Sequence, residues 1–272
     1  MLLRLAILSS SLLLPVSMLP GAERTEARAA ARSSNVTARE VTAVPTRNRV
    51  FPYMYDGNGW STTFVLTNLD NQTIHLGLDF SADDGSNLQF PIQGIGTTSA
   101  VDITLLQGGT ISLSTANVAS NRTSAYAFVA VPNGTDRFAG YAVVRQQSNN
   151  LPDLEFTIPL TPIDENQFVL PMDNTNGFTT FVSLVNSSTQ NNSNVNITVQ
   201  DQSGNVLTTD QLQIVPLGRA TFNVSDRYPQ LNNQVGSIFF NADRSQFVTG
   251  LGLRSGPNQS LTAITPFSLP LQ

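Results

Sequence analysis

The stretch GWSTTFVLTN (Gly59–Asn68) recurs without gaps as GFTTFVSLVN (Gly177–Asn186), and this repeat decides the fold of the chain. Further blocks recur in the same order: Asp79–Ile92 with Val199–Ile214, Leu106–Thr110 with Pro216–Ala220, and Phe138–Ala142 with Val248–Gly252. Two copies are fewer than a stacked solenoid needs, so each copy is predicted to fold as its own domain. Residues shared by both copies are expected to serve the fold. Residues present in one copy only are better candidates for a particular function.

Each copy consists of short segments in which apolar residues alternate with polar ones. In Thr73–Phe80 the apolar side chains fall on every second position, which is the period of a half-buried strand. The turn cluster Asp83–Asn87 and the run Leu88–Ile92 follow, so the pair is predicted to form a hairpin. Similar segments recur at Val101–Leu105, Thr110–Leu113, Ala125–Val131 and Gly140–Arg145. The pattern predicts an all-β chain of two tandem β-sandwich domains.

The N-terminus is typical of a secretory signal peptide, because Arg4 precedes an apolar run and small residues follow it. We assign residues 1–22 to this signal, with cleavage allowed as late as residue 31, and residues 23–48 to a flexible tether. Residues 49–163 are assigned to the first sandwich repeat and residues 164–272 to the second. The connection near Pro159–Gln167 is short, so the two repeats are expected to lie end to end with limited swing.

The same features predict where the protein acts. The apolar run is shorter than a membrane-spanning helix and is broken by Pro15, so no membrane span is expected in the mature chain. The protein is predicted to be secreted, or to lie at the cell surface or in the periplasm. Charged residues make up 12% of the chain, and every basic residue is arginine. No basic patch is visible, which argues against nucleic acid as a partner.

The residues that could carry catalysis or bind a metal do not form a convincing site. His75 is the only histidine and is expected on the outer face of its strand. Asp83 and Asp84 lie in a turn, whereas catalytic carboxylates face each other across a cleft. The loops Asp173–Gly177 and Asp201–Asn205 each offer one carboxylate, which is too few for calcium. We therefore predict no enzyme activity, no catalytic residues, no metal and no cofactor.

Aromatic residues are the best candidates for binding. Trp60 has Phe178 in its place in the second repeat, so it is expected to anchor the core. Tyr53 and Tyr55 occur in the first repeat only, where the second has Pro171 and Asp173. Two residues apart in an extended segment, the tyrosines share a face and are predicted to bind a ligand.

The motifs of the second repeat also suggest a relationship. An Asn-Gly-aromatic opening is followed by a hairpin turn, a Pro-x-Gly turn and a Gly-Leu-x-Leu-Arg strand, at Asn176–Thr180, Asp201–Asn205, Pro216–Gly218 and Gly250–Arg254. This series resembles the repeats of uncharacterised secreted bacterial tandem β-sandwich proteins. The resemblance implies an immunoglobulin-like sandwich and export, and it implies no particular activity. The first repeat departs from the series at Tyr55 and Trp60.

Together these features predict a non-catalytic exported protein for adhesion, surface structure or protein–protein contact. Two alternatives remain open. One is a carbohydrate-binding protein that uses an aromatic patch at Tyr53 and Tyr55, and the other is a subunit of an extracellular assembly joined through strand edges. The expected partner is accordingly a protein or a surface glycan.

Overall fold

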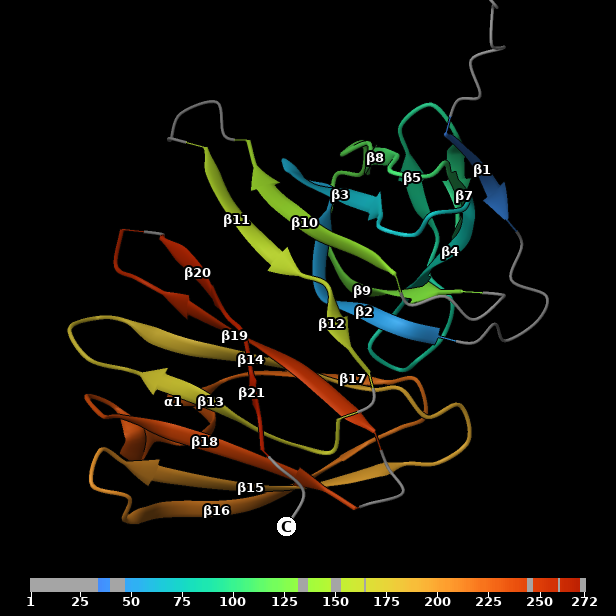
Figure 1. Cartoon of the computed structure of the whole chain (residues 1–272). Helices are drawn as coiled ribbons and strands as arrows, with labels where there is room; N and C mark the ends of the chain where they lie inside the picture. Colours follow the sequence, from blue (N-terminus) through green and yellow to red (C-terminus); the bar gives the residue numbers. More distant parts are fainter. Residues whose placement is uncertain are drawn as a thin grey trace, which may run out of the picture. The chain divides into compact units, whose positions relative to one another are not determined.

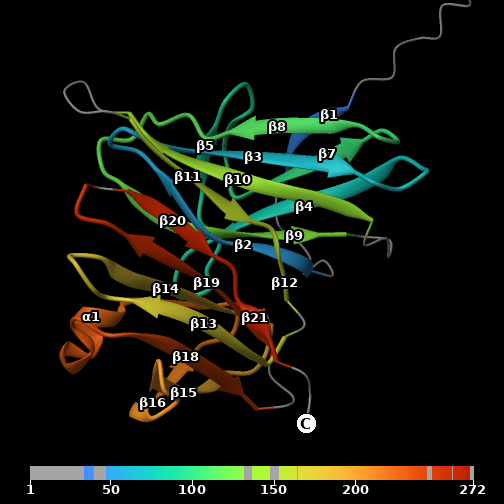
Figure 2. The same cartoon turned by 60° about the vertical axis from the view of Figure 1, so that its left-hand side comes forward.

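The computed structural model describes residues 34–39, 47–131, 137–147, 153–163, 165–243, 247–258 and 260–269. The predicted signal peptide and most of the predicted tether lie outside these residues. Within them the chain is almost entirely β (Figures 1 and 2), which confirms the all-β prediction. The helical segments of the described part are one α-helical turn, α1 (Val224–Arg227), and one 3₁₀ turn, η1 (Pro229–Leu231).

Strands up to residue 162 form the first sandwich. One of its sheets has the order β1-β7-β4-β9-β2-β12, the other has the order β11-β10-β3-β8, and a small hairpin joins β5 to β6. The strands are β1 (Asn35–Arg39), β2 (Arg47–Asp56), β3 (Trp60–Asn68), β4 (Ile74–Ser81), β5 (Phe90–Ile92), β6 (Gly96–Thr98), β7 (Ala100–Leu105), β8 (Thr110–Ser114), β9 (Thr123–Ala130), β10 (Phe138–Gln146), β11 (Leu154–Pro159) and β12 (Thr161–Pro162).

Strands from residue 167 onward form the second sandwich, with the sheet orders β16-β15-β18-β13-β21 and β17-β14-β19-β20. They are β13 (Gln167–Asp173), β14 (Thr179–Asn186), β15 (Ser193–Asp201), β16 (Val206–Ile214), β17 (Arg219–Asn223), β18 (Val235–Ala242), β19 (Val248–Ser255), β20 (Leu261–Ile264) and β21 (Phe267–Ser268). When β1, β5 and β6 are set aside, the two sandwiches have the same strand order. The sequence repeat is therefore a structural repeat.

The strand order shares two pairings with an immunoglobulin constant domain and differs in the placement of three strands. In both sandwiches the second strand pairs with the fifth, and the third pairs with the sixth, as in that domain. However, the first strand (β2) pairs with the sixth (β9), the seventh (β10) pairs with the second (β3), and the fourth (β7) pairs with the third (β4). The first, fourth and seventh strands thus lie in the opposite sheet from their places in the immunoglobulin order.

The hydrogen bonds correct the alignment of the repeats in the block Leu106–Thr110. The Asn68 N–H donates to the Gly109 carbonyl, and the Asn186 N–H donates to the Gly218 carbonyl, so Gly109 corresponds to Gly218 and Thr110 to Arg219. The block Leu106–Thr110 is therefore shifted by one residue from the predicted match.

The predicted hairpin between residues 73–80 and 88–92 forms only at its turn, where Ser81 bridges Asn87 and the Leu88 N–H donates to the Phe80 carbonyl. In the structure β4 pairs with β7 and β9, whereas β5 pairs with β6. The β5–β6 hairpin is an insertion that buries Phe90 and Ile92, so the counterpart of β16 is β7 rather than β5.

The prediction of a flexible tether over residues 23–48 is corrected for Asn35–Arg39, which forms the edge strand β1 against β7. Val36 packs against the first core. Arg39 forms ion pairs with the buried Asp79 and with Asp102. These carboxylates, remote in sequence, give the short segment partners that its own composition does not reveal.

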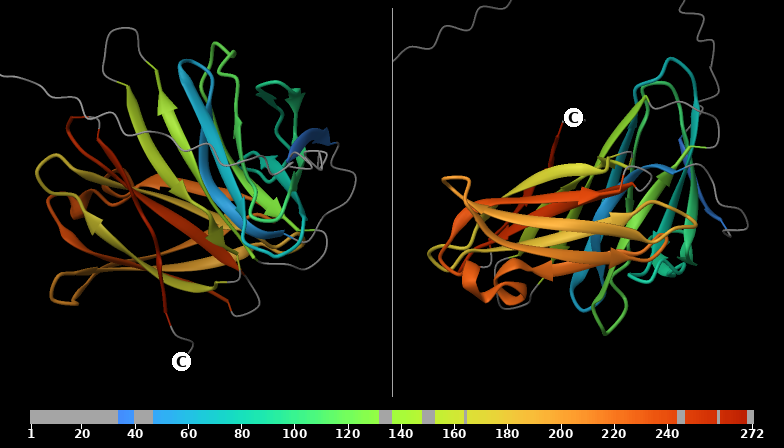
Figure 3. Two further views of the ribbon diagram at one scale, coloured as in Figure 1. Left: turned by 45° about the horizontal axis from the view of Figure 1, so that its top comes forward. Right: turned by 90° about the horizontal axis from the view of Figure 1, so that it is seen from below.

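The two sandwiches pack against each other over the outer faces of β2 and β9 on one side and of β14 and β17 on the other (Figure 3). Arg219 of β17 has a side chain with no exposed surface, and it donates to Ser124 Oγ (2.7 Å), to the Ala125 carbonyl and to Asp83. The Tyr126 hydroxyl donates to the Leu217 carbonyl. The expectation that the two sandwiches lie end to end is therefore wrong.

Candidate functional site

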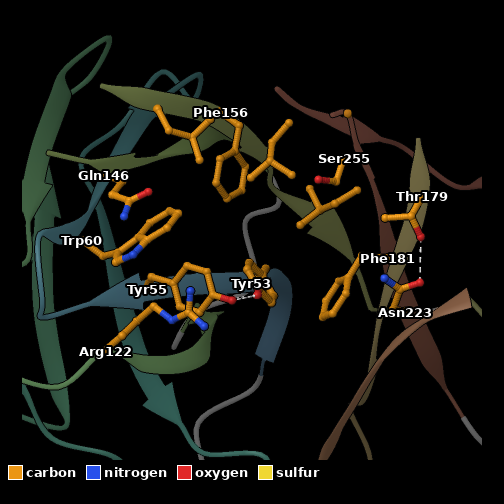
Figure 4. A pocket seen from close by; sticks show the side chains of 14 residues that line it. Tyr53, Tyr55, Trp60, Arg122, Gln146, Phe156, Thr179, Phe181, Asn223 and Ser255 are labelled. Carbon is orange, nitrogen blue, oxygen red and sulfur yellow. Dashed lines mark hydrogen bonds between the residues drawn. The ribbon is translucent and has the colours of Figure 1, made fainter. Parts of the chain in front are cut away.

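A cleft of about 400 Å³ opens where the two sandwiches diverge beyond this contact (Figure 4). The first sandwich contributes residues from β2, β3, β10, β11 and the loop before β9, and the second contributes residues from β14, β17, β19 and β20. The lining residues are Tyr53, Tyr55, Trp60, Arg122, Gln146, Leu154, Phe156, Thr179, Phe181, Asn223, Leu253, Ser255, Gly256 and Leu261. The cleft is thus mainly aromatic and apolar, with a few polar side chains.

The predicted residues Tyr53 and Tyr55 both line this cleft, but Tyr53 is buried and Tyr55 is half-buried. A bulge between Phe51 and Met54 breaks the alternation of β2, and it leaves Tyr53 and Met54 both buried. Tyr53 packs edge-on against Tyr55 at 4.8 Å and against Phe181 at 5.7 Å, measured between ring centroids. Burial, and then the neighbouring Tyr55, raise the pKa of Tyr53 above its ordinary value, so its phenol remains neutral. Tyr53 therefore packs behind the cleft walls formed by Tyr55 and Phe181.

Tyr55 belongs to an aromatic cluster with Trp60 and Arg122. The centroids of the Tyr55 and Trp60 rings lie 4.8 Å apart. The Arg122 guanidinium lies over both rings, 4.6 Å from the Tyr55 centroid and 5.7 Å from that of Trp60. Such cation–π contacts hold an arginine in place while its N–H groups stay available for hydrogen bonds.

The polar lining residues can donate and accept hydrogen bonds without carrying charge. Thr179 Oγ1 donates to Asn223 Oδ1 (2.7 Å) on the second sandwich, and Gln146 and Ser255 also reach the cleft. Among the described residues that line it, none is an aspartate, glutamate or histidine, and Arg122 is the charged one. The arrangement is suited to binding a ring-shaped polar molecule, because flat apolar surfaces alternate with amide and hydroxyl groups.

The remaining candidates lie away from this cleft. His75 is exposed, as predicted, and its Nδ1 contacts Thr104 Oγ1 at 3.1 Å. Asp84 accepts hydrogen bonds from the side chain and backbone of Ser86, which lower the pKa of its carboxyl. Asp83 forms its ion pair with Arg219.

The two loops weighed for calcium lie beside one pocket, which Thr175 and Asp201 help to line, but their carboxylates are already engaged. Asp201 accepts bonds from Ser203 and Asn205 of its own turn. Asp173 accepts bonds from Thr175 and Arg254, which lower the pKa of its carboxyl. No group of three or more metal-ligating His, Cys, Asp or Glu side chains occurs in the described part of the chain.

Sequence reasoning missed most of the cleft. Trp60 is buried as expected, but it also forms part of the wall. Arg122, Phe156 and Phe181 were not among the predicted site residues. Phe181 replaces Thr63 of the first repeat, so its copy-specific character was a usable signal. The signal could not be interpreted, because nothing in the alternation indicates that two sandwiches meet side by side.

Comparison with protein-family models, with curated proteins and with solved structures gives no match for this chain. A search of the described residues also finds no helix with the length and hydrophobicity needed to cross a membrane.

Proposed function

We propose that this protein is a non-catalytic carbohydrate-binding protein whose ligand lies in the cleft between its two sandwiches. The observation that carries the proposal is the pairing of aromatic walls, Tyr55 and Trp60 on one side and Phe181 on the other, with neutral hydrogen-bonding groups at Gln146, Asn223 and Ser255. Pyranose rings have apolar faces that stack on aromatic rings and polar edges that take hydrogen bonds.

The absence of acidic residues from the described lining favours binding over cleavage. Glycoside hydrolysis generally needs two carboxyl groups on either side of the glycosidic bond. The carboxylates nearest in sequence to the site, at Asp56 and Asp173, are engaged by the Asn117 N–H and by Arg254. A cleft without a general acid or base is suited to holding a glycan intact.

We also propose that the protein is exported and that its repeats are related to immunoglobulin-like domains. The N-terminal sequence supports export, and glycan binding by an exported protein would serve adhesion at a cell or matrix surface. The shared second–fifth and third–sixth strand pairings support an immunoglobulin-like origin for the repeats, followed by movement of the first, fourth and seventh strands between the sheets.

A glycan array followed by calorimetric titration of the strongest hit tests the proposal. Tyr55→Ala should weaken binding at least tenfold, because it removes an aromatic wall. The matched control is Tyr141→Ala, since Tyr141 is exposed on β10 and does not line the cleft. Thermal unfolding of both variants checks that they are folded. Absence of saturable binding to any glycan, or equal binding by Tyr55→Ala, would refute the proposal.

A further inference from the structure

Arg122 is a cation in the cleft that has no acidic partner among the described residues. It precedes β9, is exposed, and is held against the Tyr55 and Trp60 rings. Unlike Arg122, several arginines of the described chain form ion pairs with a carboxylate, for example Arg145 with Asp153 and Arg227 with Asp210. Among the described residues, no aspartate or glutamate forms an ion pair with Arg122.

The second sandwich shows the same combination with the carboxylate present. Phe178 occupies the position of Trp60, and the Arg254 guanidinium lies 3.4 Å from the centroid of its ring. Asp173 occupies the position of Tyr55, and its Oδ2 accepts bonds from Arg254 Nε (2.8 Å) and Nη2 (2.6 Å). Cation, aromatic ring and carboxylate thus form a closed set within the protein.

In the first sandwich the carboxylate of this set is missing, because Tyr55 stands where Asp173 does. Arg122 reaches the aromatic residue from a different strand end than Arg254 does, but it makes the same kind of stack. A guanidinium held in a partly apolar cleft attracts a carboxylate strongly, and its planar N–H groups can bind both carboxylate oxygens. The described lining contains no acidic side chain that would repel such a group.

We infer that the cleft selects an acidic sugar, a hexuronate residue of an acidic polysaccharide, whose carboxylate binds Arg122 and whose ring lies against the aromatic walls. This inference rests on the proposed function and narrows it from carbohydrates in general to those that carry a carboxylate beside the ring. The ligand would supply the anion that Asp173 supplies in the second sandwich.

Calorimetric titration of the full-length protein with trigalacturonate and with its neutral methyl ester tests this inference. Both probes have the same rings, and only one has free carboxylates. The acid should bind at least tenfold more tightly than the ester, and the difference should shrink as salt is raised. Arg122→Gln should abolish the preference, so that the acid binds this variant no more tightly than the ester does. Arg145→Gln is the control, since Arg145 is an exposed arginine outside the cleft.

The outcomes distinguish failure of the acidic-sugar inference from failure of the proposed carbohydrate-binding function. Equal binding of acid and ester, or a preference that persists in Arg122→Gln, overturns the acidic-sugar inference and leaves the proposed function standing. If the protein binds neutral glycans and no acidic ones, the acidic-sugar inference is likewise overturned and the proposed function stands. Absence of binding to any glycan overturns both. A polyglutamate peptide is the third probe: if it binds as tightly as trigalacturonate, the carboxylate is recognised without the sugar ring, and the assignment to a sugar is wrong.

Discussion

Two asparagines, Asn68 and Asn186, end the equivalent strands β3 and β14 and organise the turns beside them. The Asn68 side-chain amide donates to the carbonyls of Gln72, Leu105 and Leu106 at 2.7–3.1 Å. The Asn186 amide donates to those of Asn191, Ile214 and Val215 at 2.9–3.1 Å. Both side chains are fully buried, so each is the hydrogen-bond partner of carbonyls that have little access to water.

Replacing Asn186 by alanine should lower the free energy of unfolding by about 2–3 kcal/mol, because buried carbonyls lose their donor. Urea unfolding followed by circular dichroism measures the change, and Asn192→Ala is the control, since Asn192 is an exposed loop residue of the same type. Equal stability of the two variants would show that water replaces the amide without cost.

At the scale of single elements, the two sandwiches protect equivalent sheet edges in different ways. The edge of β7 is covered by β1. The equivalent edge strand, β16, pairs only with β15 in the described part of the chain. On its core-facing side it carries Asp210 where β7 has Val101. The Arg227 and Tyr228 side chains bond to Asp210, and the Arg227 bond in particular lowers the pKa of the Asp210 carboxyl. An inward-facing charge is one of the ways in which natural sheets prevent edge-to-edge pairing.

The variant Asp210→Val should therefore associate through β16. It restores the apolar residue of the first repeat without the covering strand. Size-exclusion chromatography with light scattering should show a mass that rises with protein concentration. Thr209→Val adds the same side chain on the exposed face of the strand and should leave the mass unchanged. If Asp210→Val has the same mass as the unmodified protein, Asp210 does not prevent association through the β16 edge.

At the scale of the whole molecule, copy-specific residues mark the contact between the sandwiches. On the outer face of β3 and β8, Thr67 and Thr110 form an exposed hydrogen-bonded pair. Their counterparts in the second sandwich are Val185 and Arg219, which are buried against the first sandwich. Arg219 also lies 5.3 Å from the centroid of the Tyr53 ring, so the contact between the sandwiches continues into the floor of the cleft.

Replacing Arg219 by methionine should separate the unfolding of the two sandwiches. The Ala125 carbonyl loses its donor and Asp83 loses its ion pair, at a cost of about 1–3 kcal/mol for the unsatisfied buried group. Scanning calorimetry should then give a calorimetric enthalpy larger than the van't Hoff enthalpy, which indicates more than one transition. Asp83→Asn, which changes only the exposed partner, should have a smaller effect. A single unchanged transition in Arg219→Met would show that apolar contacts alone couple the sandwiches.

The sequence predicts local structure well here and predicts the assembly of that structure poorly. Alternation in residues 73–80 locates β4, and the duplicated Gly59–Asn68 stretch locates β3 and β14, because periodicity and turn residues are local properties. The tether prediction failed at Asn35–Arg39, whose partners Asp79 and Asp102 are remote. Tyr53 and Tyr55 were correctly noticed as specific to one copy. Their partner Phe181 depends on the contact between sandwiches, and Arg122 reaches Tyr55 from a loop remote in sequence, so no local pattern encodes either contact.

The exchange of Thr67 and Thr110 for Val185 and Arg219 also gives the contact between the two sandwiches a direction. Identical modules joined through two different faces form an open series that has no natural end. Here the face that receives a neighbour is found on the first copy, and the face that docks onto it is found on the second. The first copy instead presents threonine hydroxyls at the docking positions. The two sandwiches, although alike in strand order, are therefore not interchangeable at their contact.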